Sequence, residues 1–192
     1  DTSPQNLKIQ LRDVDAIAIR TSELFSDILS ECLNLKIVSR HGVGTDNIDI
    51  EYLNKRKIPL AITGTANAIS VSEHVLTMIL NLSRKIKDFD NYVRSGDFED
   101  KSSILTTYEI CKKNILILGF GRIGKALQKR CKGFDMNVLV YDPYVSKEII
   151  SDLGCKKVDL SEGIKQADYI SVHMPLNTNT KNLISKNELI QM

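Results

Sequence analysis

Three glycines in one short segment constrain the fold of this chain more than any other feature of its sequence. Gly119, Gly121 and Gly124 come directly after the apolar run 115–118 and open the amphipathic segment 122–134. A short apolar run bounded by glycine is typical of a buried strand, and the segment after it has the apolar spacing of a helix. A strand that turns into a helix at Gly-x-Gly-x-x-Gly predicts a βαβ unit with a parallel sheet.

Each glycine has its own physical task in such a turn. Gly119 permits the tight turn, Gly121 lets the backbone approach a pyrophosphate, and Gly124 lets the helix pack closely on the strand. The helix start at Arg122 and Ile123 then offers backbone N–H groups, and the helix dipole favours an anion there. The Arg122 side chain is a further candidate donor to the pyrophosphate. The alternative is a solvent-exposed arginine in a first helical turn.

An acidic residue follows the next expected strand, 138–141. Asp142 comes about 20 residues after the glycines, where a carboxylate accepts hydrogen bonds from the adenosine ribose of a dinucleotide. The same carboxylate would repel the additional phosphate of NADP, and residues 141–146 contain no arginine to bind it. The alternative for Asp142 is a turn residue in an Asp-Pro pair. Together with the glycines, Asp142 predicts an NAD site and favours NAD over NADP.

Apolar runs alternate with amphipathic segments along the whole chain, which predicts an α/β fold with parallel sheets. Further strands are expected at 16–19, 36–39, 59–62 and 169–172, and further helices at 6–14, 23–30, 50–55, 70–87, 147–153 and 161–166. Capping-box patterns, Ser70 with Glu73 and Ser185 with Glu188, indicate two helix starts. The polar stretch 88–107 is expected to be a linker.

Composition and charge exclude several other classes of protein. The chain is 42% hydrophobic and 26% charged, with a formal net charge of +2 and no basic block, so nucleic acid is not an expected partner. No apolar run approaches the roughly 18 residues that span a bilayer, and no secretory signal is evident. The cysteines form no CxxC pair or Cys/His cluster, which favours reduced thiols in a cytoplasmic protein over disulfides and predicts no metal site. They are Cys32, Cys111, Cys131 and Cys155.

Four segments in order resemble the D-isomer-specific 2-hydroxyacid dehydrogenases, particularly their D-3-phosphoglycerate dehydrogenase branch. The segments are RHGVGTDNID at 40–49, ANAISVSEH at 66–74, the glycine-rich unit at 115–142 and ADYISVHMPLNTNT at 167–180. The resemblance implies a smaller flavodoxin-like α/β substrate domain at 1–66 and a Rossmann-type NAD-binding domain at 67–192. It also implies that both are incomplete, because the first strand of the former and the C-terminal half of the latter have no match.

The resemblance assigns substrate contacts to the first domain. Backbone N–H groups of Gly42, Val43 and Gly44 would hold the substrate carboxylate, since successive N–H groups in a turn form an anion nest. A plain glycine turn is the alternative. Arg20 matches an arginine near the substrate phosphate, and a surface ion-pair partner is an equally open interpretation. Asn67 matches a substrate-side polar residue, with a loop residue that bonds its own backbone as the alternative.

The same resemblance sets His173, Pro175 and Thr180 against the adenosine and ribose-phosphate parts of NAD. His173 is not expected to be a general base, because the family's catalytic histidine comes later in the chain. The family's catalytic arginine, glutamate and histidine have no match before Met192, so no catalytic residue is predicted here.

The function that the resemblance implies is hydride transfer between NAD and C2 of a small D-2-hydroxy or 2-oxo acid. The favoured substrate is 3-phosphoglycerate, which would place the enzyme in serine biosynthesis, and the expected assembly is a homodimer. The alternative is an NAD-binding regulatory or corepressor-like module without catalysis, since a fold does not fix a function.

Overall fold

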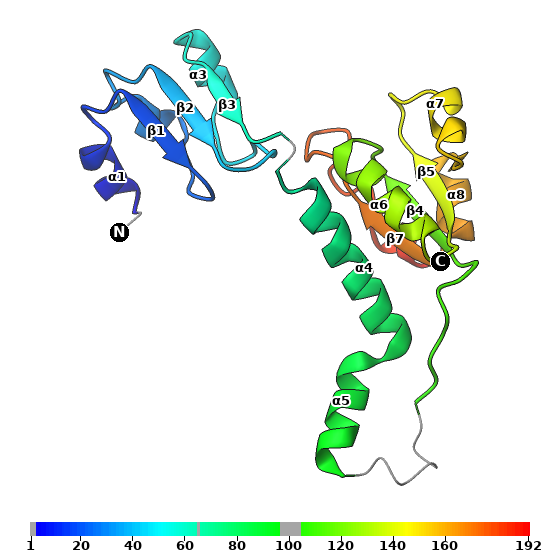
Figure 1. Ribbon diagram of the computed structural model, residues 1–192. Helices are drawn as coiled ribbons and strands as arrows, with labels where there is room; N and C mark the ends of the chain where they lie inside the picture. Colours follow the sequence, from blue (N-terminus) through cyan, green and yellow to red (C-terminus); the bar gives the residue numbers. More distant parts are fainter. Residues whose placement is uncertain (1–2, 65, 97–104) are drawn as a thin grey trace. The chain divides into compact units, whose positions relative to one another are not determined.

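The computed structural model describes residues 3–64, 66–96 and 105–192, and the chain divides into two compact units (Figure 1). The first unit is Asp1–Asn67 and the second is Ala68–Met192. Both contain a parallel sheet with helical crossovers, so the expected α/β class is confirmed.

The first unit has a three-stranded sheet in the order β1-β2-β3. Its strands and helices are α1 (Pro4–Gln10), β1 (Ala16–Ile19), α2 (Ser26–Leu29), β2 (Ile37–Arg40), α3 (Ile50–Lys55) and β3 (Leu60–Ile62). Val38, in the central strand, is completely buried, and it shares a core cluster with Leu29 and Leu53 of the two crossover helices. The carboxyl ends of β1 and β2 are aligned, because Ile19 pairs with Arg40. Loops that follow these strands therefore emerge at one edge of the sheet.

The second unit has a four-stranded parallel sheet in the order β6-β5-β4-β7. Its strands are β4 (Asn114–Leu118), β5 (Asn137–Tyr141), β6 (Lys156–Lys157) and β7 (Tyr169–Val172). Its helices are α4 (Ala68–Arg84), α5 (Ile86–Ser95), α6 (Arg122–Lys132), α7 (Lys147–Asp152), α8 (Leu160–Gln166) and α9 (Lys186–Leu189). Because β4 pairs with β5 on one side and β7 on the other, the strand order reverses at β4.

Strand β4 is buried on both faces. Ile115 and Ile117 belong to a core cluster with apolar residues of α4 and α6, while Leu116 and Leu118 belong to a second cluster with Ile164 of α8. All four side chains have no exposed surface. Continuous apolar sequence is what a parallel strand covered by helices on both faces requires. Burial of each such side chain contributes about 2 kcal/mol, so β4 anchors the turn that follows it.

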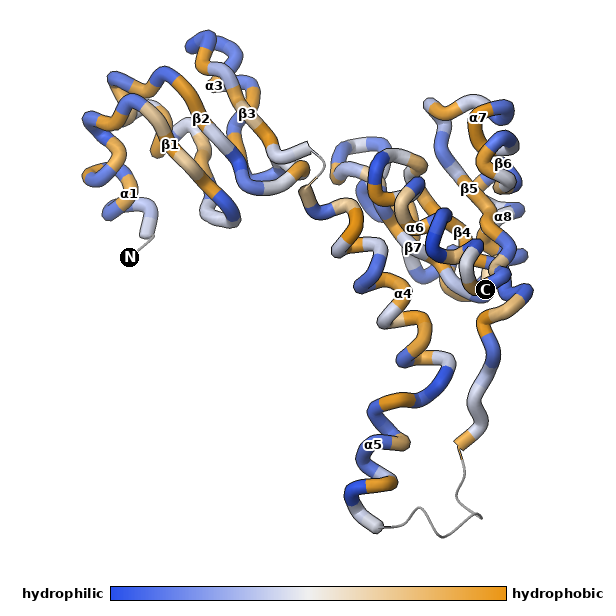
Figure 2. The backbone as a smooth tube through the Cα atoms, in the orientation of Figure 1, coloured by the Kyte–Doolittle hydropathy of each residue, from blue (hydrophilic) through white to orange (hydrophobic). Residues whose placement is uncertain are grey.

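Helix α4 is amphipathic, with hydrophobic and hydrophilic residues alternating along it and along α5 (Figure 2). Val75, Leu76 and Ile79 are buried in the core, whereas Met78 and Leu82 remain exposed. The predicted capping box at Ser70 is wrong, because α4 begins at Ala68 and Ser70 lies inside its first turn. The predicted capping box at Ser185 is confirmed, with Glu188 bonding back to the Ser185 backbone.

Several elements differ from the sequence expectation, including α1 and α2, which are shorter than the expected helices at 6–14 and 23–30. Helix α4 ends at Arg84, because Lys85 adopts a left-handed conformation (φ 51°), and α5 then occupies the start of the expected linker. Ile86, Phe89 and Val93 have helical spacing there, which outweighs the polar composition of the segment. Residues 97–104 of the expected linker lie outside the described residues. Strand β6 was not expected, since a two-residue edge strand of lysines carries no apolar run.

We expect Gly124→Ala to lower the free energy of unfolding by about 2 kcal/mol, because overpacking forces the backbone to shift. A Cβ at Gly124 would lie 2.4 Å from the Gly119 carbonyl oxygen and 3.2 Å from Ile117 Cγ2. Urea denaturation measures the change. Gly121→Ala is the matched control, since a Cβ there meets no described atom within 4 Å. Equal stability of the two variants would show that the close α6–β4 approach is not required.

Candidate functional site

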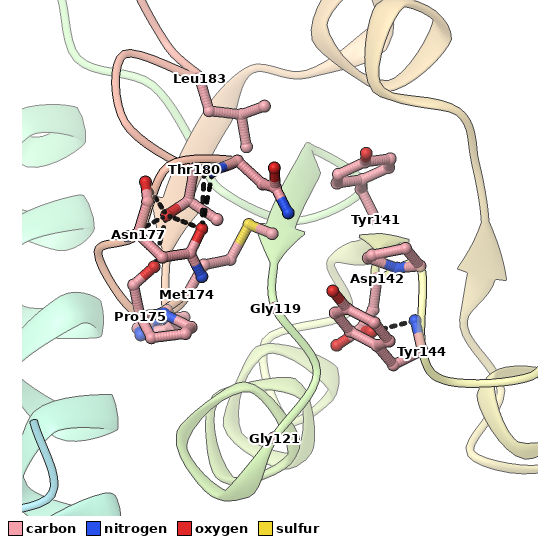
Figure 3. A pocket seen from close by; sticks show the side chains of 13 residues that line it. Gly119, Gly121, Tyr141, Asp142, Tyr144, Met174, Pro175, Asn177, Thr180 and Leu183 are labelled. Atoms are coloured by element: carbon pink, nitrogen blue, oxygen red, sulfur yellow. Dashed lines mark hydrogen bonds between the residues drawn. The ribbon is translucent and has the colours of Figure 1, made fainter. Parts of the chain in front are cut away.

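A cavity of about 250 Å³ lies at the carboxyl ends of β4, β5 and β7 (Figure 3). Its walls come from the glycine turn after β4, the turn after β5 and the loop after β7. The lining residues are Gly119, Gly121, Tyr141, Asp142, Pro143, Tyr144, His173, Met174, Pro175, Asn177, Asn179, Thr180 and Leu183. In open parallel sheets, ligands bind at the carboxyl edge where the strand order reverses. The cavity occupies that position.

The three glycines have three different environments. Gly119 has φ +92°, and a Cβ there would lie 2.8 Å from the His173 carbonyl oxygen, so only glycine fits. At Gly121 a Cβ would meet no described atom within 4 Å, which leaves the backbone open to a ligand from the cavity. Gly124 is buried where α6 crosses β4. The geometry therefore provides space for a pyrophosphate at the second glycine.

Helix α6 begins at Arg122, directly beside the cavity, and Gly121 is its N-cap residue. The described first turn of this helix contains no acidic side chain, while Lys129, Arg130 and Lys132 lie in its last turn. The partial positive charge at the helix start is therefore not neutralised by an acidic residue of its own first turn, and it favours an anionic ligand. The Arg122 and Ile123 side chains do not line the cavity, so any contribution from Ile123 would come from its backbone N–H.

Asp142 connects two walls of the cavity. Its Oδ2 accepts a hydrogen bond from the Phe120 backbone N–H at 2.7 Å, inside the glycine turn. Its Oδ1 accepts from the N–H groups of Tyr144 at 2.8 Å and Val145 at 3.2 Å. The residue is only 8% exposed, and these bonds offset the cost of burying a carboxylate. A carboxylate offers about four lone-pair positions, so acceptor capacity remains for a sugar hydroxyl.

The loop after β7 forms the opposite wall. The His173 ring Nε2 lies 2.8 Å from Ser171 Oγ, and burial lowers the pKa of His173, so the imidazole is neutral at pH 7. The Thr180 hydroxyl donates to the Pro175 carbonyl oxygen and accepts from the Asn177 N–H at 2.9 Å (Figure 3). The Thr180 side chain thus shapes the loop, and its single O–H is already used as a donor.

Several lining residues were not predicted from the sequence. Tyr141, Pro143, Tyr144, Met174, Asn177, Asn179 and Leu183 also line the cavity. Most of them are next to a predicted residue in the sequence, and this adjacency was the one signal that could have identified them. The apolar surfaces of Tyr141, Pro143 and Tyr144 suit a flat heteroaromatic base, and Tyr144, within the turn that Asp142 holds, is 88% exposed.

The predicted substrate residues belong to the first unit and are not among the lining residues of this cavity. Gly42 has φ +143°, and its N–H donates to Thr63 Oγ1 at 2.8 Å, so the first N–H of the expected nest is already bonded. The Arg40 guanidinium covers Gly42 and bonds the Asn47 side chain at 3.4 Å. Arg40 and Thr63 were not predicted, because only the folded chain brings them to the glycine loop.

The remaining predicted substrate residues are placed as follows. Arg20 is exposed and comes directly after β1, at the same sheet edge as Arg40. Val43 and Gly44 are exposed in the same loop as Gly42, and Asn67 ends the first unit. The Asn47 amide also donates to the Ser22 carbonyl oxygen at 2.7 Å, which connects the glycine loop to the segment after Arg20.

The described residues contain no cluster of three or more His, Cys, Asp or Glu that could hold a metal ion. All four cysteines are free thiols, and burial raises the pKa of Cys131 to about 12. Among the helices in the described part of the chain, none is long and apolar enough to cross a bilayer.

A parallel sheet, a glycine turn at its switch point and an acid at the end of the next strand define a dinucleotide-binding domain of the Rossmann type. Residues 76–192 match the model of the NAD-binding domain of the D-isomer specific 2-hydroxyacid dehydrogenases. The chain therefore belongs to that family, and its second unit is an NAD-binding domain.

Individual relatives agree with this assignment. The chain is 36% identical to the D-3-phosphoglycerate dehydrogenase of Archaeoglobus fulgidus, an alignment that covers 99% of this chain and 36% of the relative. It is 34% identical to the glyoxylate reductase of Thermococcus litoralis, covering 94% of this chain and 56% of the relative. The crystal structure of Aquifex aeolicus D-lactate dehydrogenase with NAD and lactic acid superposes with a TM-score of 0.88 at 30% identity. That match covers 96% of this chain and 55% of the other.

We expect Asp142→Ala to weaken NAD binding by about ten-fold or more, because a hydrogen bond to a charged group contributes about 1.5–3 kcal/mol. The affinity for NADP should fall less, since the substitution also removes a charge that repels the additional phosphate. Calorimetry with both dinucleotides measures the two affinities. Asp152→Ala, at an exposed carboxylate of α7, is the control. An unchanged NAD affinity in Asp142→Ala would contradict the ribose assignment.

Proposed function

We propose that this protein is an NAD-dependent oxidoreductase that acts on a small D-2-hydroxy acid, with 3-phosphoglycerate as the favoured substrate. The observation that carries the proposal is the open backbone at Gly121 beside a carboxylate, Asp142, that is hydrogen-bonded to the same turn. These features accommodate the two polar parts of a dinucleotide, its pyrophosphate and its adenosine ribose. The chain spans 36% of the length of the A. fulgidus relative, and the activity is proposed for the whole protein.

The residues of the second unit would hold NAD in a fixed direction. The pyrophosphate would lie over Gly121 at the start of α6, where N–H groups and the helix dipole favour an anion. The ribose diol would bond Asp142, and the adenine would lie against the apolar surfaces of Pro143 and Tyr144. His173, Pro175 and Thr180 would complete the opposite wall. When bound, NAD supplies the hydride acceptor at the nicotinamide C4.

The first unit would bind the acid substrate, as part of a flavodoxin-like substrate domain at residues 1–66. Two arginines support a substrate with two anionic groups, because Arg20 directly follows β1 and Arg40 ends the neighbouring strand β2 at the same sheet edge. One would bond the phosphate and the other would add positive charge at the carboxylate loop 42–44. Asn67 would add a polar contact. The A. fulgidus relative, a D-3-phosphoglycerate dehydrogenase, supports the phosphorylated substrate.

A homodimer is part of the proposal. Five apolar side chains of α4 and α5 are exposed to between 46% and 64%, namely Ile69, Met78, Leu82, Ile86 and Val93. Exposed apolar surface of this extent along consecutive helices is typical of an interface between protein chains. A second copy would bury these residues against the same helices of its partner.

The decisive experiment combines NAD binding with turnover by the natural full-length protein. We expect binding of NAD by calorimetry and formation of NADH from NAD with one or more D-2-hydroxy acids, 3-phosphoglycerate giving the highest kcat/KM. Absence of NAD binding would overturn the whole proposal. Tight NAD binding with no turnover of any acid would overturn the enzyme and leave the regulatory NAD-binding module.

Substitution of Arg20 distinguishes a contact to the phosphate group of the substrate from contacts to the rest of the substrate. We expect Arg20→Ala to raise KM for 3-phosphoglycerate by about 10–100-fold, because a charge-assisted hydrogen bond of about 1.5–3 kcal/mol is lost. The KM for unphosphorylated D-glycerate should hardly change. Arg12→Ala is the control, since Arg12 is exposed in the turn between α1 and β1, before the amino end of the strand that Arg20 follows. Equal changes in KM for both acids would remove the phosphate role of Arg20.

A further inference from the structure

We propose that Lys157 is a positioning residue for the adenosine side of the cofactor cavity. The proposal rests on the proposed assignment of Asp142 to the ribose, and it adds a residue that does not itself line the cavity. Lys157 lies in β6, the edge strand beside β5. Its ammonium Nζ donates a hydrogen bond to the Val145 carbonyl oxygen at 2.6 Å. The edge strand is thereby connected to the turn that forms one wall of the cavity.

The hydrogen bond from Lys157 is connected to Asp142 through the backbone of Val145. The N–H of Val145 donates to Asp142 Oδ1, so this residue is held on both of its backbone polar groups. Tyr144, between them, donates its own N–H to the same oxygen. The other carboxylate oxygen accepts from Phe120 in the glycine turn. A single series of hydrogen bonds therefore joins β6, the turn after β5 and the turn after β4.

A lysine is well suited to this position. The Val145 carbonyl accepts its hydrogen bond from a side chain of the edge strand β6, and among the described residues no fifth strand continues the sheet beyond β6. A charged donor makes a stronger hydrogen bond to a carbonyl than a neutral donor does. The Glu148 backbone N–H and the Ser146 hydroxyl lower the pKa of the Glu148 carboxyl, and the charges of Lys147 and Lys157 make smaller contributions in the same direction.

The neighbouring lysine provides an internal comparison. Successive side chains of a strand point to opposite faces, and Lys156 accordingly bonds Glu162 at 2.9 Å, on α8. Both lysines carry the same charge in the same two-residue strand. Only Lys157 contacts the turn that Asp142 organises. A difference between their variants would therefore report the contact and not the charge.

The test compares Lys157→Met with Lys156→Met in the natural full-length protein. We expect Lys157→Met to weaken binding of NAD and of AMP by the same factor, about five-fold, because a turn that is no longer fixed must be ordered on binding. Lys156→Met should bind both ligands as the wild type does, and Lys157→Arg should recover most of the lost affinity. Calorimetry gives the dissociation constants, and the wild type is measured first.

A double-mutant cycle tests whether Lys157 acts through the turn. In the Asp142→Ala background we expect Lys157→Met to have no further effect on AMP binding, because interacting residues are not additive. Equal five-fold losses in both backgrounds would overturn the proposal. So would a larger loss for NADP than for NAD, which would make Lys157 a direct phosphate ligand. Failure of the wild type to bind NAD would overturn the proposed function instead, and wild-type affinity in Lys157→Met would overturn this inference alone.

Discussion

The hydrogen bond between the Phe120 N–H and the Asp142 carboxylate is the contact on which the rest of the cofactor site depends. It joins the turn after β4 to the turn after β5, two segments separated by a whole helix in the sequence. The turn after β4 leaves the backbone at Gly121 open to a ligand, and the turn after β5 carries the acidic residue Asp142. Joined at 2.7 Å, they form one surface. Burial of the carboxylate at 8% exposure makes the bond difficult to replace, because an unpaired buried charge is costly.

The strands hold this contact in place through their own backbone bonds. The sheet ladder continues past the strand ends, since Gly119 N–H bonds the Tyr141 carbonyl at 2.9 Å and His173 N–H bonds the Leu118 carbonyl at 2.7 Å. The turn after β4 therefore begins at Gly119, where the backbone hydrogen bonds of the sheet end. These bonds leave Gly119 little conformational freedom. Gly119 meets this constraint with φ +92°, because any side chain would collide with the His173 backbone. Core packing of β4 thus determines where the cavity lies.

Local signals in the sequence were sufficient for much of this arrangement. Strands at 16–19 and 169–172 agree with the structure at both ends, and the glycine turn follows β4 as expected, because apolar runs and glycine act on neighbouring residues. Contacts between distant segments were not predictable in the same way. Thr63 reaches Gly42 across 21 positions, and Lys157 reaches Val145 from a strand with no apolar residue. Helix α5 was missed because its polar composition concealed a helical spacing of apolar side chains.

The distribution of charge around the cavity also gives the site a direction. The start of α6 offers partial positive charge at Gly121. The carboxylate of Asp142 presents negative charge next to it, because it is hydrogen-bonded to the N–H of Phe120, the residue before Gly121. A dinucleotide has the complementary order, with its anionic pyrophosphate next to neutral hydroxyls that donate hydrogen bonds. The reverse orientation would bring phosphate against carboxylate, a repulsion that protein surroundings strengthen relative to water. A nucleotide with an additional phosphate on the ribose meets the same repulsion. One buried carboxylate would therefore account for both the proposed orientation of the ligand and the proposed preference for NAD over NADP.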